Sequence, residues 1–314
     1  MFLATTDIPI QPKSLYEPVR YVISGGGKRL RPVLTMFTCD MMKGNTEEGL
    51  IAGAALELLH NFTLVHDDIM DNADTRRGRL TVHKKWDYNT AILAGDQLIA
   101  LAYNILFGKS YYIKNINRVA DTFTKAIIEV CEGQSYDKDF ELQETVTMDE
   151  YIMMITKKTA KLLEACTLIG GIISDASEEE LGYLSGYAIN TGIAFQILDD
   201  LLDVIGDEKT FGKKPGGDIR EGKKTYLHIK ALEMAKDADD KKILEYISQK
   251  NPVIREDDFF KVASKVYEKT GAIDFAGNAI KQYTDEAYKY LHNLFGVDTE
   301  PLGWFADMLL KRKY

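Results

Sequence analysis

Apolar residues recur at helical spacing along most of this 314-residue chain. In residues 45–71, for instance, Leu50, Ala54, Leu58 and Phe62 follow one another every four positions, which places them on one side of a helix. The same periodicity predicts helices near residues 88–106, 115–135, 222–235, 255–268 and 271–294. Strands of a half-buried sheet would instead alternate with period two, and no such segments bounded by Asn-Gly or Asp-Gly turns occur.

Helix start signals support this interpretation. A capping residue followed three positions later by glutamate occurs at Asn45 with Glu48, Thr147 with Glu150, and Ser177 with Glu180. No repeat of 20 to 50 residues and no low-complexity linker divides the chain. We therefore expect an all-α fold, a single-domain helical bundle over residues 1–314. The Gly/Lys-rich segment 206–222 is the one long loop expected, of the kind that often covers a functional site.

Composition excludes several classes of protein. The formal net charge is −9, from 39 basic and 48 acidic residues, so the general basic character of a nucleic-acid-binding domain is missing. The first residues lack a charged start before an apolar core, so we expect no signal peptide, and we find no run near the roughly 18 apolar residues of a membrane span. Cys39, Cys131 and Cys166 are odd in number and far apart, which predicts three buried thiols in a reducing compartment and a cytoplasmic protein.

Three aspartates interrupt an apolar helical segment, FQILDDLLDVIG, at Asp199, Asp200 and Asp203. A solvated acidic face is a poor explanation there, because carboxylates in apolar surroundings need cations or hydrogen-bond donors to offset their desolvation. The same spacing occurs at Asp67, Asp68 and Asp71, with Asp74 a turn further. On its own that cluster would be read as a solvated helix face.

Paired rows of carboxylates indicate a hard metal ion. Oxygen ligands suit Mg²⁺, which retains several waters and is commonly shared with substrate phosphates. No cluster of His and Cys ligands indicates a softer metal. The two rows therefore predict a magnesium site that binds a phosphate-containing substrate.

Basic residues gather near these rows although the chain as a whole is acidic. Guanidinium and ammonium groups beside magnesium ligands are what diphosphate binding requires. A phosphate-binding P-loop is excluded because Lys28 lacks the glycine at position 22, and Lys224 replaces the hydroxyl residue after Lys223. The basic residues concerned are Lys28, Arg29, Arg31, Arg76, Arg77, Lys157, Lys158, Lys213 and Lys223.

Taken together, these motifs resemble the trans-isoprenyl diphosphate synthases, the polyprenyl synthetase family. The resemblance runs from about residue 20 to residue 226 through GGGKRLRP, HNFTLVHDDIMD, RRG, KKT, FQILDDLLD and GKKPGGDIREGKKTY, in that order. It implies an isoprenoid synthase bundle around a deep central cavity, a homodimer, and three Mg²⁺ ions held on an allylic diphosphate. Leu80 stands where the family usually has proline, which we expect to alter only the local turn, and the segment before Lys28 is short for the family.

The resemblance also assigns roles to individual residues. It implies that Asp67, Asp68, Asp71, Asp199, Asp200 and Asp203 bind the metal. It implies that Arg76, Lys158, Gln196, Lys213 and Lys223 bind the allylic diphosphate. Lys28, Arg31, His60 and Arg77 match the isopentenyl diphosphate site, and His60 lies seven residues before Asp67, which puts it on the aspartate face of the helix.

The implied reaction proceeds through a carbocation. Diphosphate leaves the allylic substrate, the double bond of isopentenyl diphosphate attacks the cation, and a proton is lost. Metal and cationic groups on the leaving diphosphate would supply most of the catalysis. Thr159 and Gln196 would help to stabilise the cation through their oxygen dipoles.

Phe62 is the candidate for setting product length. It lies five residues before Asp67, about 7.5 Å along the helix axis. Thr63 aligns better with the Asp67 face but is too small to close a channel, so size favours Phe62. The resemblance associates an aromatic residue here with C15 to C20 products, and Thr63 beside it favours C20, geranylgeranyl diphosphate, over C15.

Two alternatives belong to other classes. A class I terpene cyclase has the same fold but consumes no isopentenyl diphosphate, and its second motif usually mixes Asn, Ser and Glu. A non-catalytic subunit of a heteromeric prenyl synthase generally lacks one aspartate row. This chain has both rows and the basic GGGKRLRP segment, so a condensing prenyltransferase is the function we expect.

Overall fold

The computed structural model describes residues 8–108, 112–206, 215–248 and 257–310. Two compact units make up the chain: unit 1 comprises Met1–Ile127 and Ala165–Gly182, and unit 2 comprises Ile128–Glu164 and Tyr183–Tyr314. Each unit is helical. The all-α fold class is therefore confirmed, while a single domain around a central cavity stays a prediction.

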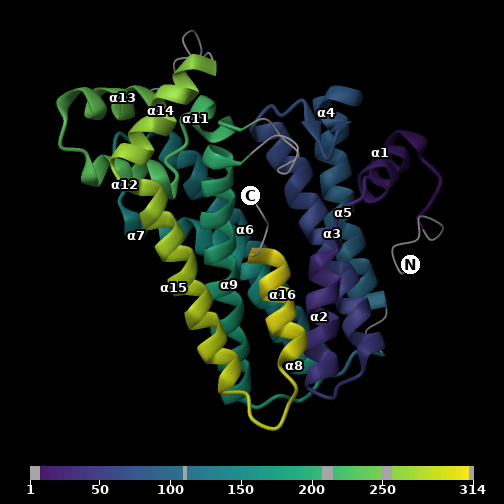
Figure 1. Cartoon of the computed structure of the whole chain (residues 1–314). Coiled ribbons are helices and arrows are strands. Elements are labelled where there is room, and N and C mark those ends of the chain that lie inside the picture. Colours follow the sequence, from purple (N-terminus) through teal and green to yellow (C-terminus); the bar gives the residue numbers. More distant parts are fainter. Residues whose placement is uncertain (1–7, 109–111, 207–214, 249–256, 311–314) are drawn as a thin grey trace. The chain divides into compact units, whose positions relative to one another are not determined.

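Unit 1 is organised around one long helix. Helix α3 packs against both α2 and α5, and α5 also contacts α1 and α4 (Figure 1). Buried leucines such as Leu34, Leu56, Leu59 and Leu98 form the core of this unit. The elements that begin in it are α1 (Lys13–Ile23), α2 (Leu30–Met41), α3 (Thr46–Met70), β1 (Thr75–Arg76), β2 (Arg79–Leu80), α4 (Val82–Lys85), α5 (Tyr88–Gly108) and α6 (Ile116–Leu142).

Unit 2 is built around α12, which contacts α7, α13, α14 and α15 (Figure 1). Its core includes Tyr151, Leu201, Leu227, Leu244 and Tyr267. The remaining elements are α7 (Met148–Ile155), the π-helix η3 (Thr156–Ala160), α8 (Lys161–Ile173), α9 (Glu178–Ile205), α11 (Gly217–Glu221), α12 (Tyr226–Met234), α13 (Ala238–Ser248), α14 (Asp257–Lys269), α15 (Ala272–His292) and α16 (Glu300–Leu310). Residues of α6, α8 and α9 belong to both units.

The three start signals are helix caps in the structure. The Asn45 side chain accepts a hydrogen bond from the Glu47 N–H and donates one to Glu48. Thr147 and Glu150 form a reciprocal capping box, and the bonds between Ser177 and Glu180 repeat it. The predicted helices are confirmed, although α6 extends to Leu142 and the long loop contains the short helix α11.

A two-stranded hairpin was missed by the sequence analysis. Thr75 pairs with Leu80, and Arg76 pairs with Arg79. The two turn residues Arg77 and Gly78 both have positive φ, 53° and 72°, as a type I′ turn requires. With Arg instead of Asn or Asp at the first turn position, the usual sequence signal of this turn was missing.

One further expectation needs correction, and another stays a prediction. Cys39 and Cys166 are buried free thiols as expected, whereas Cys131 is exposed. Helix α5 is long and apolar enough to cross a membrane by length and composition, with one third of that stretch buried. A core helix of a folded unit can pass the same test, and α5 packs along α3 in this way. The absence of a membrane span therefore stays a prediction.

Candidate active site

The first aspartate row lies at the C-terminal end of α3. Asp67 and Asp71 are partly exposed, and Asp71 ends the helix by donating its N–H to the Asp67 carbonyl over 2.8 Å. Asp68 is only 4% exposed and accepts a hydrogen bond from Arg76 Nε over 2.6 Å. Burial raises the pKa of Asp68 to about 6, and the charge of Arg76 opposes that rise. The row therefore contains two accessible carboxylates and one held by the hairpin.

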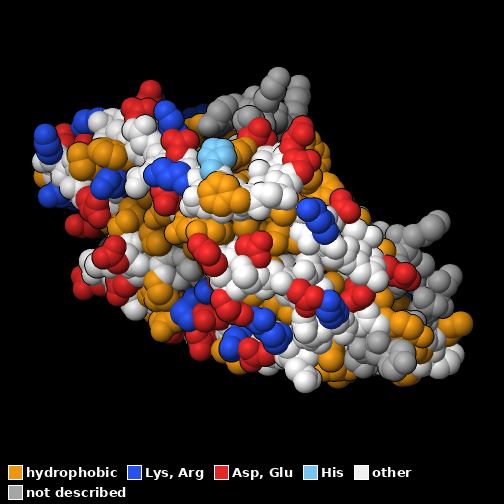
Figure 2. Space-filling view, turned by 90° about the horizontal axis from the view of Figure 1, so that it is seen from below, with side chains coloured by type: hydrophobic (Ala, Val, Ile, Leu, Met, Phe, Trp, Pro, Cys, Tyr) orange, Lys and Arg blue, Asp and Glu red, His pale blue; other side chains and the backbone are white. Residues whose placement is uncertain are grey.

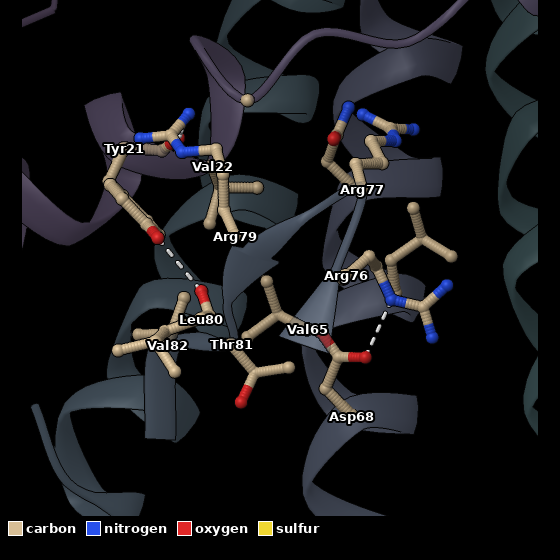
Figure 3. A pocket seen from close by; sticks show the side chains of 13 residues that line it. Tyr21, Val22, Val65, Asp68, Arg76, Arg77, Arg79, Leu80, Thr81 and Val82 are labelled. Atoms are coloured by element: carbon tan, nitrogen blue, oxygen red, sulfur yellow. Dashed lines mark hydrogen bonds and ion pairs between the residues drawn. The ribbon is translucent and has the colours of Figure 1, made fainter. Parts of the chain in front are cut away.

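The hairpin presents the RRG motif to the residues around it. Arg76 on β1 reaches Asp68 (Figure 3), whereas Arg77 at the turn donates to the Gly26 carbonyl over 2.5 Å. Gly27 has a φ of 111°, and a Cβ atom there would lie 2.7 Å from the Arg77 guanidinium carbon. Only glycine fits at position 27, so the glycine-rich segment and the hairpin form one structure.

A cavity of about 410 Å³, open to solvent, lies in unit 1 beside the hairpin (Figure 3). Asp68, Arg76 and Arg77 line it together with Tyr21 and Arg79. The Tyr21 hydroxyl donates to the Leu80 carbonyl over 2.8 Å, and the Arg79 guanidinium lies 3.8 Å from the centre of the Tyr21 ring. These contacts tie α1 to the hairpin and so fix the strand that follows the two arginines.

Three of the residues expected to bind isopentenyl diphosphate influence one another electrostatically: Arg31, His60 and Arg77. Burial lowers the pKa of His60 well below its usual range, and the charges of Arg31 and Arg77 add to this effect. Burial also lowers the pKa of Arg31, and Glu57 opposes that shift. His60 is therefore a neutral imidazole among guanidinium groups. Lys28 is exposed on the loop before α2.

Three residues of this site were not assigned a role from the sequence. Arg29 has a φ of 51° and pairs with the buried Glu57 over 2.7 Å. Asn61 donates to the Glu57 carbonyl over 2.6 Å. A glutamate inside the apolar run GAALELLHNF, one turn before His60, was the signal that could have identified Glu57.

The second aspartate row lies on α9 in unit 2. Asp199 is partly exposed, whereas Asp200 is buried and accepts three hydrogen bonds, from Tyr151 Oη over 2.6 Å, the Tyr226 N–H over 3.0 Å and Gln196 Nε2 over 3.1 Å. Burial raises the pKa of Asp200 to about 7, and these donors oppose the rise.

Asp203 is fully buried and organises the loop that follows α9. Its carboxylate accepts from the N–H groups of Gly217 and Asp218, over 3.2 and 3.0 Å, in the first turn of α11. An aspartate at a helix N-terminus is favoured by the orphan N–H groups and the dipole there. The three carboxylates of this row thus have different surroundings, and Asp199 is the most exposed of them.

The KKT motif lies on the π-helix η3, a form often found at functional sites. Lys158 Nζ bonds to Asp137 over 2.6 Å, and Thr159 Oγ1 donates to Gln196 Oε1 over 2.8 Å. A Cβ atom at Gly133 would lie 2.3 Å from the Lys158 nitrogen, so the glycine lets α6 approach this turn closely.

A second cavity, of about 450 Å³ and also open to solvent, lies in unit 2. Its lining combines residues predicted from the sequence with others that were missed: Asp137, Tyr151, Lys158, Gln196, Asp200, Asp218, Lys223, Lys224 and Thr225. Lys223 pairs with Glu221 over 2.7 Å. Lys213, predicted to bind diphosphate, lies outside the described residues.

The residues predicted to set product length lie on α3. Phe62 is half-buried, and its ring packs edge-on against His66 with 4.7 Å between the ring centres. His66 in turn lies against Gly95 of α5, where a Cβ atom would be 2.2 Å from its Nε2. Thr63 donates to the His60 carbonyl over 2.8 Å.

The donor set suits magnesium better than a softer metal. Both rows offer carboxylate oxygens, and in the part of the chain that the structure describes no three His, Cys, Asp or Glu side chains converge on one point. A metal held by one or two carboxylates, water and substrate phosphates fits this arrangement.

Comparison with known proteins identifies the family. The polyprenyl synthetase family model matches residues 12–263. A short chain isoprenyl diphosphate synthase of Methanocaldococcus jannaschii is 48% identical over 76% of this chain and 72% of its own. A geranylgeranyl diphosphate synthase of Sulfolobus acidocaldarius is 38% identical over 98% of this chain and 92% of its own.

A solved structure agrees with these sequence relatives. A geranylgeranyl pyrophosphate synthase from Corynebacterium glutamicum, complexed with isoprenyl diphosphate and magnesium, has 27% identity and a TM-score of 0.88, covering 99% of this chain and 94% of its own. The motifs, the helical fold and these matches lead to one conclusion: the chain belongs to the polyprenyl synthetase family.

Proposed function

We propose that this protein is a short-chain trans-prenyltransferase that condenses isopentenyl diphosphate with C5 to C15 allylic diphosphates. The observation that carries the proposal is the same in both units. Each aspartate row adjoins an open cavity that is also lined by cationic side chains, Arg76 and Arg77 in unit 1 and Lys158 and Lys223 in unit 2. Diphosphates need such paired metal ligands and cations.

The more exposed carboxylates are the best placed to hold magnesium, namely those of Asp67, Asp71 and Asp199. The buried carboxylates of Asp68, Asp200 and Asp203 support the two rows. Magnesium, when bound, neutralises the charge that develops on a departing diphosphate. We propose three such ions, and the magnesium in the C. glutamicum complex supports the choice of metal.

The side chains of the protein would then divide the work. In unit 1, Arg76 is a proposed diphosphate ligand. In unit 2, Lys158 and Lys223 bind the allylic diphosphate, and Gln196 takes part by orienting the residues beside it. Its Nε2 donates to Asp200 and its Oε1 accepts from Thr159. The side-chain oxygens of Gln196 and Thr159 would face the carbocation. This cation forms when the C–O bond of the allylic substrate breaks and its electrons leave with the diphosphate. The C=C electrons of isopentenyl diphosphate then form the new C–C bond, and loss of a proton restores the double bond.

Arg31, Arg77 and the neutral His60 bind the second diphosphate, with Lys28 reaching it from the exposed loop. Because the pKa of His60 is depressed, its role is that of a neutral hydrogen-bonding group rather than a proton donor. The proposed product is C20, geranylgeranyl diphosphate, with Phe62 ending the chain-binding channel. Sequence relatives named geranylgeranyl diphosphate synthase support this length.

A second copy of the chain is the proposed protein partner. Helix α5 exposes Tyr88, Ile92, Leu93 and Phe107, each at least 45% accessible. Exposed apolar side chains along one helix are the kind of surface that a second copy of the chain can cover. The face drawn in Figure 2 carries acidic and basic side chains interspersed, so nothing on it indicates a nucleic-acid partner. The three cysteines of the described chain are free, which supports a reducing cytoplasmic location.

The decisive experiment incubates the protein with labelled isopentenyl diphosphate and C5, C10 or C15 allylic primers. Magnesium-dependent prenyl products should form, and chromatography then reports their length. Asp67→Ala and Asp199→Ala should each lower kcat at least about 10²-fold, by comparison with the loss of one transition-state ligand. Asp121→Ala, an exposed aspartate on α6, is the matched control. Turnover in excess chelator, or consumption of the primer without isopentenyl diphosphate, would rule out this function.

A further inference from the structure

Glu57 is a buried acid in the middle of α3. Its side chain is 2% exposed, Oε1 accepts from Arg29 Nη1 over 2.7 Å, and Asn61 Nδ2 lies 3.4 Å from the same oxygen. The second oxygen, Oε2, is buried without a hydrogen-bond partner. A buried carboxylate with an unsatisfied oxygen is costly, so a compensating interaction must favour it here.

The compensation comes from cations on neighbouring elements. Arg29 enters α2 with a left-handed backbone, and its Nη2 donates to the Ile23 carbonyl, which holds its guanidinium against Glu57. The charge of Glu57 raises the pKa values of Arg31 and Arg77, both of which burial lowers. One carboxylate thus stabilises the charged form of several guanidinium groups. Arg31 also has a buried Nε without a partner.

Glu57 lies about one helical turn before His60 on α3 and pairs with Arg29, two residues before Arg31, so this acid adjoins residues that we assign to diphosphate binding. A fixed negative charge there repels the substrate, so its presence calls for a physical reason. Without substrate, Arg29, Arg31 and Arg77 would repel one another in a partly desolvated site, and the neutral His60 offers no relief. An anion supplied by the protein lowers that repulsion, and the diphosphate takes over part of this role on binding.

We propose that Glu57 is a built-in counter-anion of the isopentenyl diphosphate site: it stabilises the empty arginine cluster and, by the same charge, weakens diphosphate binding. Glu57 is a positioning residue in this proposal, since it acts through the arginines. The proposal rests on the function proposed above for the identity of the ligand.

Glu57→Gln tests it, because glutamine keeps the shape and an acceptor for Arg29 but removes the charge. The probe is isopentenyl diphosphate, titrated by calorimetry into the full-length protein in magnesium-free buffer with chelator, so that no metal-held site contributes. We expect the melting temperature without ligand to fall by several degrees. The Kd for isopentenyl diphosphate should become roughly three- to tenfold tighter, the size expected for removing one nearby like charge. Glu47→Gln, an exposed charge removal on the same helix, should change neither value.

A charge-balanced variant separates electrostatics from packing. Arg29→Gln alone should weaken binding by a similar factor, because Glu57 then loses its direct partner. Arg29→Gln combined with Glu57→Gln removes one charge of each sign and should return Kd to within about twofold of the wild type. This pair of variants tests the proposal even if Glu57→Gln alone does not fold, and Glu57→Asp should keep a wild-type Kd.

Each result has a distinct meaning. If Glu57→Gln lowers the melting temperature but leaves Kd unchanged or makes binding weaker, the counter-anion proposal is wrong and Glu57 only supports the fold. The proposal is equally wrong if the double variant binds no more tightly than Arg29→Gln. If the wild-type protein binds no isopentenyl diphosphate at all, the proposed substrate site itself is wrong.

Discussion

Replacing Tyr151 by phenylalanine removes one oxygen from a buried polar network of unit 2. The Tyr151 hydroxyl donates to the buried Asp200 carboxylate over 2.6 Å, and burial beside that carboxylate raises the pKa of Tyr151 well above its usual range. The phenol therefore stays protonated and serves only as a donor to Asp200. Phenylalanine keeps the ring packing, including the edge contact with Tyr226 at 6.2 Å.

The expected loss of stability in Tyr151→Phe follows from the negative charge on the acceptor, the Asp200 carboxylate. A hydrogen bond to a charged group contributes about 1.5–3 kcal/mol, against about 0.5–1.5 kcal/mol for a neutral pair. Tyr187→Phe is the matched control, because the Tyr187 hydroxyl is also buried but donates to the neutral Leu302 carbonyl over 2.7 Å. We expect Tyr151→Phe to lower the free energy of unfolding by about 2 kcal/mol and Tyr187→Phe by about 1 kcal/mol.

Urea unfolding at pH 8.5, above the pKa of about 7 that burial gives Asp200, measures the difference. Steady-state kinetics should show a further contrast. Asp200 also holds Gln196, so Tyr151→Phe should lower kcat by up to about tenfold, whereas Tyr187→Phe should not. If Tyr151→Phe is no less stable than the control, the bond to Asp200 is not charge-assisted and our account of this network is refuted.

Three further outcomes test other parts of the structure. Arg31→Ala or His60→Ala should mainly raise KM for isopentenyl diphosphate, by about 1.5–3 kcal/mol in binding free energy; a rise confined to the allylic primer would show that the two diphosphate sites are wrongly divided. Phe62→Ala should lengthen the product by at least one isoprene unit in the primer assay, and an active, stable variant with unchanged products would assign the end of the channel to another residue. Burial lowers the pKa of His228 to about 3 from 6.5, so its neutral form stabilises the fold fully above pH 6.5 and progressively less as the pH falls toward 3. Between pH 7.5 and 5.0 the wild type should lose about 2 kcal/mol more stability than His228→Gln, and equal losses in urea titrations would contradict this.

The sequence alone determined the fold class and the two acidic motifs. Helix periodicity and capping pairs are local signals that depend on residues three to four positions apart, so α3, α5 and α15 could be predicted within a few residues. The spacing of Asp67, Asp68 and Asp71 is local in the same way, and resemblance to the family added the roles of the basic residues.

Tertiary structure decided what each charged residue does. Asp199, Asp200 and Asp203 are alike in sequence, yet Asp200 is buried by Tyr151 from α7 and Asp203 caps α11. These contacts join residues 14 to 49 positions apart, so local sequence patterns do not reveal them. The hairpin itself pairs residues only three and five positions apart, but its contacts with Asp68 and Gly26 join residues 8 and 51 positions apart. Neither periodicity nor motif spacing encodes which distant donors reach a carboxylate, since burial and partner choice depend on how the helices pack.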